Sequence, residues 1–233
     1  MSTPANPLYQ DEIYYPESDG LPMADNTQQF EWIVTVKEGL DVMLPNDFVG
    51  GNIFWYPIEK MSSTKQSPDI LVALGRPKGN RSSYKQWEEG GVAPQIVFEI
   101  LSPGNSYEEM RAKEEFYEHH GVEEYYIYSP QTNTLFGWER VNQRLQKINL
   151  MQGWVSPRLG IRFERTPETL HIYRPDGERF LTFAELDIER RRERAEKERE
   201  RAEKEAAQAV IREQQVAIER LKQQLRELGH NPD

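Results

Sequence analysis

The sequence contains no cysteine among its 233 residues, which excludes a disulfide framework and any thiolate metal site. It also has no apolar run near the roughly 20 residues that a membrane-spanning helix needs. The first 27 residues are polar and proline-containing, without the basic and apolar regions of a secretory signal. We therefore expect a soluble, cytoplasmic protein that does not associate with a membrane.

An excess of basic residues is also absent. The formal net charge is −10, from 29 basic and 39 acidic residues. Residues from Ala184 onward hold 12 basic and 13 acidic side chains, which leaves 17 basic and 26 acidic ones, or −9, in the body of the chain. Because phosphate neutralisation supplies most non-specific affinity for nucleic acid, this balance argues against a constitutive, high-affinity nucleic-acid binder.

One loop departs from this balance. Between residues 75 and 94, four basic side chains face only two acidic ones, Glu88 and Glu89. The loop is interpreted either as a local phosphate-binding patch or as a solvated loop with scattered charges, and the sequence leaves both open. The basic residues are Arg76, Lys78, Arg81 and Lys85.

The sequence also lacks a phosphate-cradling glycine-rich motif and an ordered Ser/His/Asp set. What it does contain is two short aliphatic runs, residues 68–74 and 96–101, each interrupted by one carboxylate. Such runs are typical of buried strands. The carboxylates are Asp69 and Glu99. Burial of an unpaired carboxylate is costly, so Glu99 requires a partner or a metal ion.

A helix after the second run supplies a candidate partner. Ser106 to Glu109 form a capping box that predicts the start of a helix, and Gly121 marks its end. Lys113 lies three residues after Met110 and four before Tyr117, so it is predicted to share their inward face. From spacing alone two alternatives remain. Asp69 and Glu99 bind a metal ion near Lys113, or Asp69 caps a turn while Glu99 and Lys113 form a structural ion pair.

The ordered motifs resemble the Uma2 family, formerly a domain of unknown function, of the P-D…(D/E)-x-K nuclease superfamily. They cover roughly residues 28 to 187 and comprise Pro68-Asp69, Phe98-Glu99 to Ser102-Pro103, Lys113, Tyr117, and Gly121 to Pro130. The resemblance implies a restriction-endonuclease-like fold and a divalent-metal site. The superfamily places its lysine two residues after the acid, where this chain has Leu101, so the resemblance assigns that role to Lys113.

The resemblance favours a metal-dependent endonuclease that hydrolyses DNA phosphodiester bonds. Asp69, Glu99 and the Ile100 carbonyl are the expected ligands of Mg²⁺ or Mn²⁺, and Lys113 is expected to serve the attacking water. The catalytic set would then be Asp69, Glu99 and Lys113. The alternative is a non-catalytic scaffold that keeps the nuclease fold and oligomerises through its C-terminal helix.

The sequence divides into three predicted regions: a flexible arm over 1–27, an α/β domain over 28–183, and a charged helix over 184–229. In the middle region we expect a mixed β-sheet flanked by helices. The predicted helices cover residues 28–40 and 106–120. The predicted strands cover 53–58, 70–74, 96–101, 125–128, 134–138, 145–150, 161–163 and 170–173.

The last region indicates a coiled coil. An identical five-residue segment occurs at Arg194–Glu198 and Arg201–Glu205, offset by seven. Further along, aliphatic residues recur at heptad spacing, with Gln214 as a polar member of the series. We expect self-association through this helix, which would make the protein a homo-oligomer and present two sites to a duplex. A lone charged helix is the alternative. The heptad residues are Ile211, Ile218, Leu221, Leu225 and Leu228.

Overall fold

The computed structural model describes residues 13–17 and 24–227, and it divides into two units that meet at residue 183. Most of the predicted arm over residues 1–27, together with Leu228, lies outside the described residues. In the part that is described, none of the helices combines the length and the apolar character that a membrane crossing needs.

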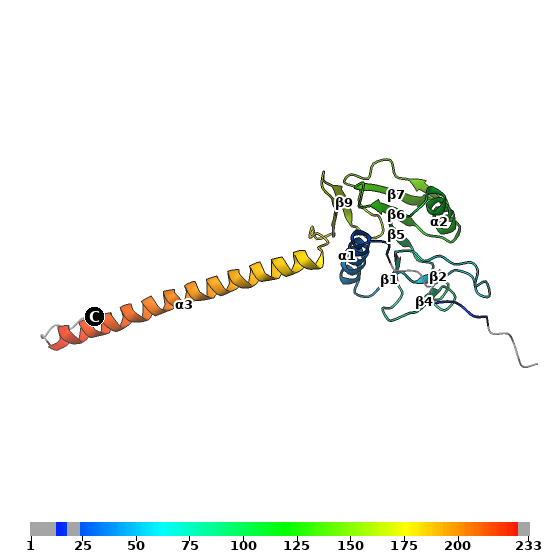
Figure 1. The fold of residues 1–233 in the computed structure, drawn as a ribbon. Coiled ribbons are helices and arrows are strands. Elements are labelled where there is room, and N and C mark those ends of the chain that lie inside the picture. Colours follow the sequence, from blue (N-terminus) through cyan, green and yellow to red (C-terminus); the bar gives the residue numbers. More distant parts are fainter. Residues whose placement is uncertain (1–12, 18–23, 228–233) are drawn as a thin grey trace, which may run out of the picture. The chain divides into compact units, whose positions relative to one another are not determined.

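A six-stranded mixed sheet forms the centre of the first unit (Figure 1). Its strand order is β1-β3-β5-β6-β7-β8, and only the β5–β6 pair is parallel. This confirms the mixed α/β sheet that the sequence predicts. The strands are β1 (Phe48–Gly51), β3 (Ile70–Ala73), β5 (Ile96–Ile100), β6 (Glu124–Ser129), β7 (Thr134–Val141) and β8 (Arg144–Lys147).

The two carboxylate-bearing runs become β3 and β5, which pair antiparallel as central neighbours. Every residue of both strands is buried, because each face of the sheet carries its own hydrophobic core. Ile96, Phe98 and Ile100 contribute to one core and Val97 to the other. Continuous aliphatic runs are what such two-sided burial requires.

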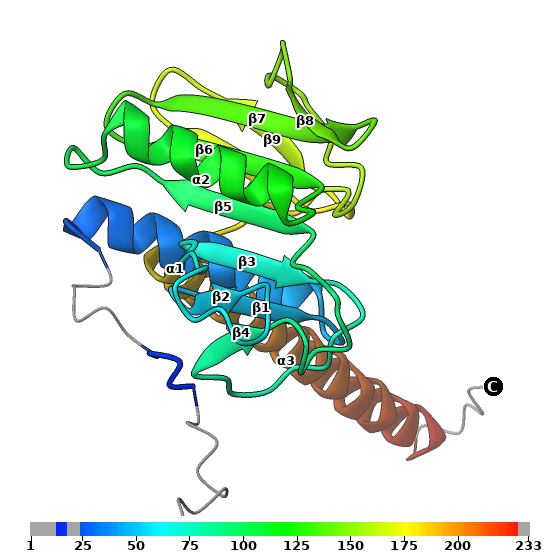
Figure 2. The same ribbon diagram turned by 90° about the vertical axis from the view of Figure 1, so that its right-hand side faces the viewer.

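Helix α1 (Thr27–Met43) and a small antiparallel sheet cover the first face (Figure 2). The side chain of Asn26 caps α1 by accepting a hydrogen bond from the Gln29 backbone. Phe180 packs so closely on α1 that a Cβ at Gly39 would come within 2.6 Å of its ring. Glycine is therefore required at this crossing. The small sheet comprises β9 (Arg162–Arg165) and β10 (Leu170–Tyr173).

Helix α2 (Tyr107–His119) covers the opposite face, with Met110 and Tyr117 buried. Ser106 is its N-cap, as predicted, and accepts a hydrogen bond from the Glu109 backbone at 3.1 Å. The Glu109 carboxylate accepts hydrogen bonds from the Asn105 side chain. Gly121, at φ +93°, ends the helical segment in a conformation that favours glycine.

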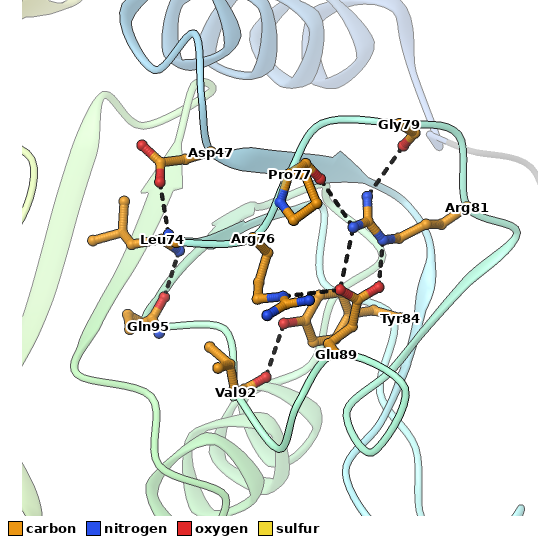
Figure 3. Close-up of polar contacts among 11 residues, drawn as sticks. Asp47, Leu74, Arg76, Pro77, Gly79, Arg81, Tyr84, Glu89, Val92 and Gln95 are labelled. Atoms are coloured by element: carbon orange, nitrogen blue, oxygen red, sulfur yellow. Dashed lines mark hydrogen bonds and ion pairs between the residues drawn. The ribbon is translucent and has the colours of Figure 1, made fainter.

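Residues 75–94 form an ordered connection that includes a strand the sequence analysis missed. Strand β4 (Ser83–Lys85) pairs in parallel with β2 (Phe54–Tyr56) beside the α2 core. Arg76 and Arg81 both bind the Glu89 carboxylate, at 3.1 and 2.5 Å (Figure 3). The Tyr84 hydroxyl donates to the Val92 carbonyl at 2.8 Å.

The four basic residues of this connection are all ion-paired. Besides the two arginines on Glu89, Lys78 pairs with Asp41 at 2.5 Å and Lys85 with Glu88 at 3.3 Å. The loop is therefore neither a free basic patch nor a set of scattered solvated charges. Its cations form ion pairs within the connection and, through Lys78, with α1.

A short described part of the N-terminal region also packs on the domain. Tyr15 lies 5.1 Å from Tyr56 and 5.2 Å from Trp87 between ring centroids. The Tyr56 hydroxyl donates to the Pro16 carbonyl at 2.5 Å, and the Ser82 hydroxyl donates to Glu17 at 2.6 Å. Residues 13–17 are thus held against β2 and β4.

The second unit contains α3 (Phe183–Glu227), a single helix of 45 residues. It has no buried residue among those described. Arg191, Arg199 and Arg201 each pair with an acid one turn away along the helix. Such pairs stabilise an exposed helix by about 0.2–0.5 kcal/mol each. Its aliphatic residues remain exposed, including Ile211, at 53 %.

Candidate functional site

The register of β3 and β5 brings Asp69 and Glu99 together. Ile70 pairs with Phe98, so Asp69 and Glu99 occupy the next position outward along the two strands. The Ile100 backbone donates to Asp69 Oδ2 at 2.7 Å, which places the Asp69 carboxylate against the peptide between Glu99 and Ile100. Asp69 and Glu99 are 8 % and 2 % exposed. The two predicted site carboxylates are therefore adjacent and buried.

Two side chains from α2 reach Glu99. Lys113 Nζ lies 3.0 Å from Glu99 Oε2, and the Tyr117 hydroxyl donates to Glu99 Oε1 at 2.5 Å. Their four-residue separation puts both on the helix face that packs against the sheet. The structure thus places Lys113 on the inward face, as its spacing predicts, and brings it directly to Glu99.

The cluster has more acidic groups than basic ones. The pKa of Asp69 is raised to about 8, mainly because the carboxyl group is buried and also because the Glu99 carboxylate lies beside it. For Lys113, burial lowers the pKa, but Glu99 and Asp69 raise it, and the net direction is upward. Lys113 is therefore a cation at neutral pH. One lysine faces two carboxylates, and a proton on Asp69 compensates the excess.

A buried residue of α1, Gln29, contacts the site from the other face, and the sequence analysis did not identify it. Its side-chain amide donates to the Ile100 carbonyl at 2.8 Å and its carbonyl accepts from the Asp25 backbone at 2.8 Å. The Ser102 hydroxyl in turn donates to the Asp25 carboxylate. The signal was present, since Gln29 lies four residues before Ile33 in the buried stripe of α1.

The donor set is compatible with a hard divalent cation. Two carboxylates and a backbone carbonyl supply oxygen atoms of the kind that Mg²⁺ prefers. Both oxygens of Glu99 and the Ile100 carbonyl already accept hydrogen bonds, so a bound ion would have to share these oxygens or displace their donors. Among the described residues there is no group of three or more His, Asp or Glu side chains that could hold a metal ion. Asp69, Glu99 and the Ile100 carbonyl would therefore have to supply the protein ligands, with water or substrate oxygens completing the shell. A divalent cation would compensate the second carboxylate in place of the proton on Asp69.

The mixed sheet, the adjacent acids and the lysine on α2 form the arrangement that the sequence predicts. The Uma2 family, described as "Putative restriction endonuclease", matches residues 43–166. That match spans more than half of the chain, so the protein belongs to the Uma2 family, and at the level of the family it is a nuclease.

Comparison with solved structures gives a distant likeness. A crystal structure from Anabaena variabilis, described as "a putative nuclease belonging to DUF820", matches with a TM-score of 0.42 and 14 % sequence identity. The match covers 57 % of this chain and 72 % of the other. No curated protein matches the sequence.

Proposed function

We propose that the protein is a divalent-metal-dependent endonuclease that hydrolyses DNA phosphodiester bonds at Asp69 and Glu99. The observation that carries the proposal is the charge imbalance of the buried cluster. A closed structural ion pair needs one carboxylate for Lys113, but two are present, and the pKa of Asp69 rises to about 8 as a result of burial and Glu99. A second buried acid without a cation costs stability, which a metal-binding function would explain.

The roles of the side chains follow from their charges. Because its pKa is raised, Lys113 stays protonated, so it acts by orienting water and offsetting charge on the phosphate rather than as a base. Burial raises the pKa of Tyr117 well above its usual value, so its hydroxyl remains a donor and fixes the Glu99 carboxylate. A bound divalent ion would supply Lewis-acid stabilisation of the phosphate oxygens.

Cleavage of supercoiled plasmid DNA tests this proposal. With Mg²⁺ or Mn²⁺ the wild-type protein should nick or linearise the plasmid, and a chelator should stop the reaction. Lys113→Gln should reduce the rate by about 100-fold or more, since loss of one charge-stabilising group has that order of effect. Arg111→Gln is the matched control because it removes a cation from the same helix at an exposed ion pair with Glu115.

The scaffold alternative predicts a different result. A folded wild-type protein that cleaves no form of DNA with either metal would contradict the nuclease proposal and favour a non-catalytic protein that uses the fold for interactions. Equal rates for wild type and Lys113→Gln would contradict the role assigned to the lysine.

We also propose that α3 self-associates as a short coiled coil. The support is an exposed aliphatic series at heptad spacing, in which Ile211 and Ile218 are 53 % and 51 % exposed and Leu225 is 41 % exposed. Leu221, three residues after Ile218, is 59 % exposed and supplies the second position of that heptad. Pairing of two such helices would bury these side chains, which a lone helix leaves in water.

A further inference from the structure

A groove at the β7–β8 edge of the sheet has a charge opposite to that of the body. It measures about 360 Å³ and is lined by the start of β7, the end of β8, the segment after it, and Arg165 of β9. Its two charged residues are Lys147 and Arg165, and none of its lining residues carries a carboxylate. In a body with 26 acidic and 17 basic residues up to position 183, an acid-free groove is distinctive.

The two cations are not used in ion pairs. Most Lys and Arg side chains of the first unit pair with an acid, whereas within the described chain neither Lys147 nor Arg165 does. Both are exposed. Lys147 Nζ lies 4.6 Å from the ring centre of Phe136 and 5.9 Å from that of Trp138, so the rings hold the ammonium group at the groove. Asn149 and Gln152 add amide groups to the lining.

One wall of the groove, Phe136, lies on the α2 face of the sheet, whereas Arg165 comes from β9 on the opposite face, so the groove is at the edge of the sheet. Glu99 pairs with Ile127, and Ile127 pairs with Phe136, so the three residues form one row across the sheet on the same face. Two strand spacings of about 4.8 Å separate Glu99 from Phe136 along this row. The distance from Glu99 to Phe136 is therefore about 10 Å, and the two cations lie beyond this row, on β8 and β9.

We propose that this groove, defined by Phe136, Lys147, Asn149, Gln152 and Arg165, binds the phosphate backbone of the DNA substrate at the edge of the sheet. The inference rests on the proposed nuclease function and adds the place where the substrate strand is held. Among the described residues Lys147 and Arg165 form no ion pair with an acid, so they can pair with phosphates without breaking one. The connection over residues 75–94, whose cations are all paired, lacks this property. Arg165 also donates to the Asn133 carbonyl at 3.3 Å, and its other N–H groups can reach a phosphate.

The test is the salt dependence of DNA binding, measured by fluorescence anisotropy with a labelled duplex of about 20 base pairs in Mg²⁺ buffer. All proteins carry Glu99→Gln so that the strand stays intact. If each cation contacts one phosphate, Lys147→Gln/Arg165→Gln should lower the slope of log K against log salt by about 2 and weaken binding at low salt. The matched control is Arg111→Gln/Arg144→Gln, two exposed cations outside the groove that already pair with acids.

The outcomes separate this proposal from the proposed function. If the groove variant and the control have the same slope and affinity as their parent, the groove proposal is overturned while the nuclease proposal stands. If neither this parent nor the wild-type protein binds DNA, both proposals fail. Melting curves on each variant verify folding. If the double variant unfolds, Arg165→Gln alone replaces it, and the expected change in slope is then about 0.9.

Discussion

At the scale of single residues, Tyr117 and Tyr125 form a natural comparison. Their rings lie 5.0 Å apart in the same core. The Tyr117 hydroxyl donates to buried Glu99, whereas the Tyr125 hydroxyl is buried with no hydrogen-bond partner among the described residues. Removal of a donor from a buried charged acceptor is costly, but removal of an unsatisfied hydroxyl is nearly neutral or stabilising.

Tyr117→Phe should therefore lower the free energy of unfolding by about 1–3 kcal/mol, because Glu99 Oε1 loses its donor. Tyr125→Phe should leave stability unchanged or raise it. Urea denaturation of the two variants and the wild type measures the difference. Equal losses in both variants would show that the hydroxyl of Tyr117 contributes nothing specific to Glu99.

The raised pKa of Asp69 predicts a pH-dependent stability. Burial and Glu99 raise it from 3.8 to about 8, so the folded state holds this proton more tightly than the unfolded state. The contribution of the protonated carboxyl is complete below about pH 4 and is lost as pH rises toward 8. In metal-free buffer, the stability of Asp69→Asn relative to wild type should thus increase between about pH 4 and pH 8. Above pH 8 the difference in stability between the two proteins should be constant.

Melting temperatures between pH 4 and 9 in the presence of a chelator measure this gap. Asp176→Asn, at an exposed turn, is the control and should run parallel to wild type. Parallel curves for Asp69→Asn as well would mean that folding does not raise the pKa of Asp69, and the burial and Glu99 effects assigned to it would be contradicted.

Some of the site residues could be identified from sequence and others could not. Lys113 was assigned to the inward face by its spacing from Met110 and Tyr117, which is a local property of one helix. The contact of Gln29 with the Ile100 carbonyl joins residues 71 positions apart, so it depends on how α1 packs on the sheet. A polar residue in an apolar stripe indicates that it has a buried hydrogen-bond partner, but the sequence does not identify which residue that partner is.

At the scale of elements, the connection over residues 75–94 depends on Glu89, which bonds both Arg76 and Arg81. Glu89→Gln should destabilise the protein by about 1–3 kcal/mol, because two partly buried arginines lose their shared acid. It should also make trypsin cut the connection faster. Glu88→Gln is the control, since Glu88 is exposed and makes one long contact with Lys85. Equal trypsin sensitivity in the two variants would contradict this role for Glu89.

The helices and strands also show which local sequence signals are enough to predict an element. Helix α2 was predicted within one residue at each end because its capping serine and terminating glycine are local signals. Strands β1 and β4 were missed. β1 contains Gly50 and Gly51, which have low strand propensity, and it exists because it pairs with the buried strand β3. β4 is only three residues long and is specified by its pairing with β2.

At the scale of the whole molecule, the oligomeric state depends on α3. If the exposed aliphatic series pairs between copies, sedimentation equilibrium should give a dimer or larger species for the full chain. A chain ending at residue 182 should be monomeric. Ile218→Glu, which places a charge in the centre of the series, should have the same effect in the full-length protein. A monomeric full chain would contradict self-association.

Calorimetric titration of Mn²⁺ into the full chain measures whether the Asp69–Glu99 pair binds a divalent cation. We expect saturable heat for wild type and none for Glu99→Gln. Loss of stability in that variant is a weaker criterion, because Asp69 can ionise and compensate Lys113 when Glu99 is neutral. Absence of heat in the wild type would contradict the account and leave Glu99 and Lys113 as a structural ion pair.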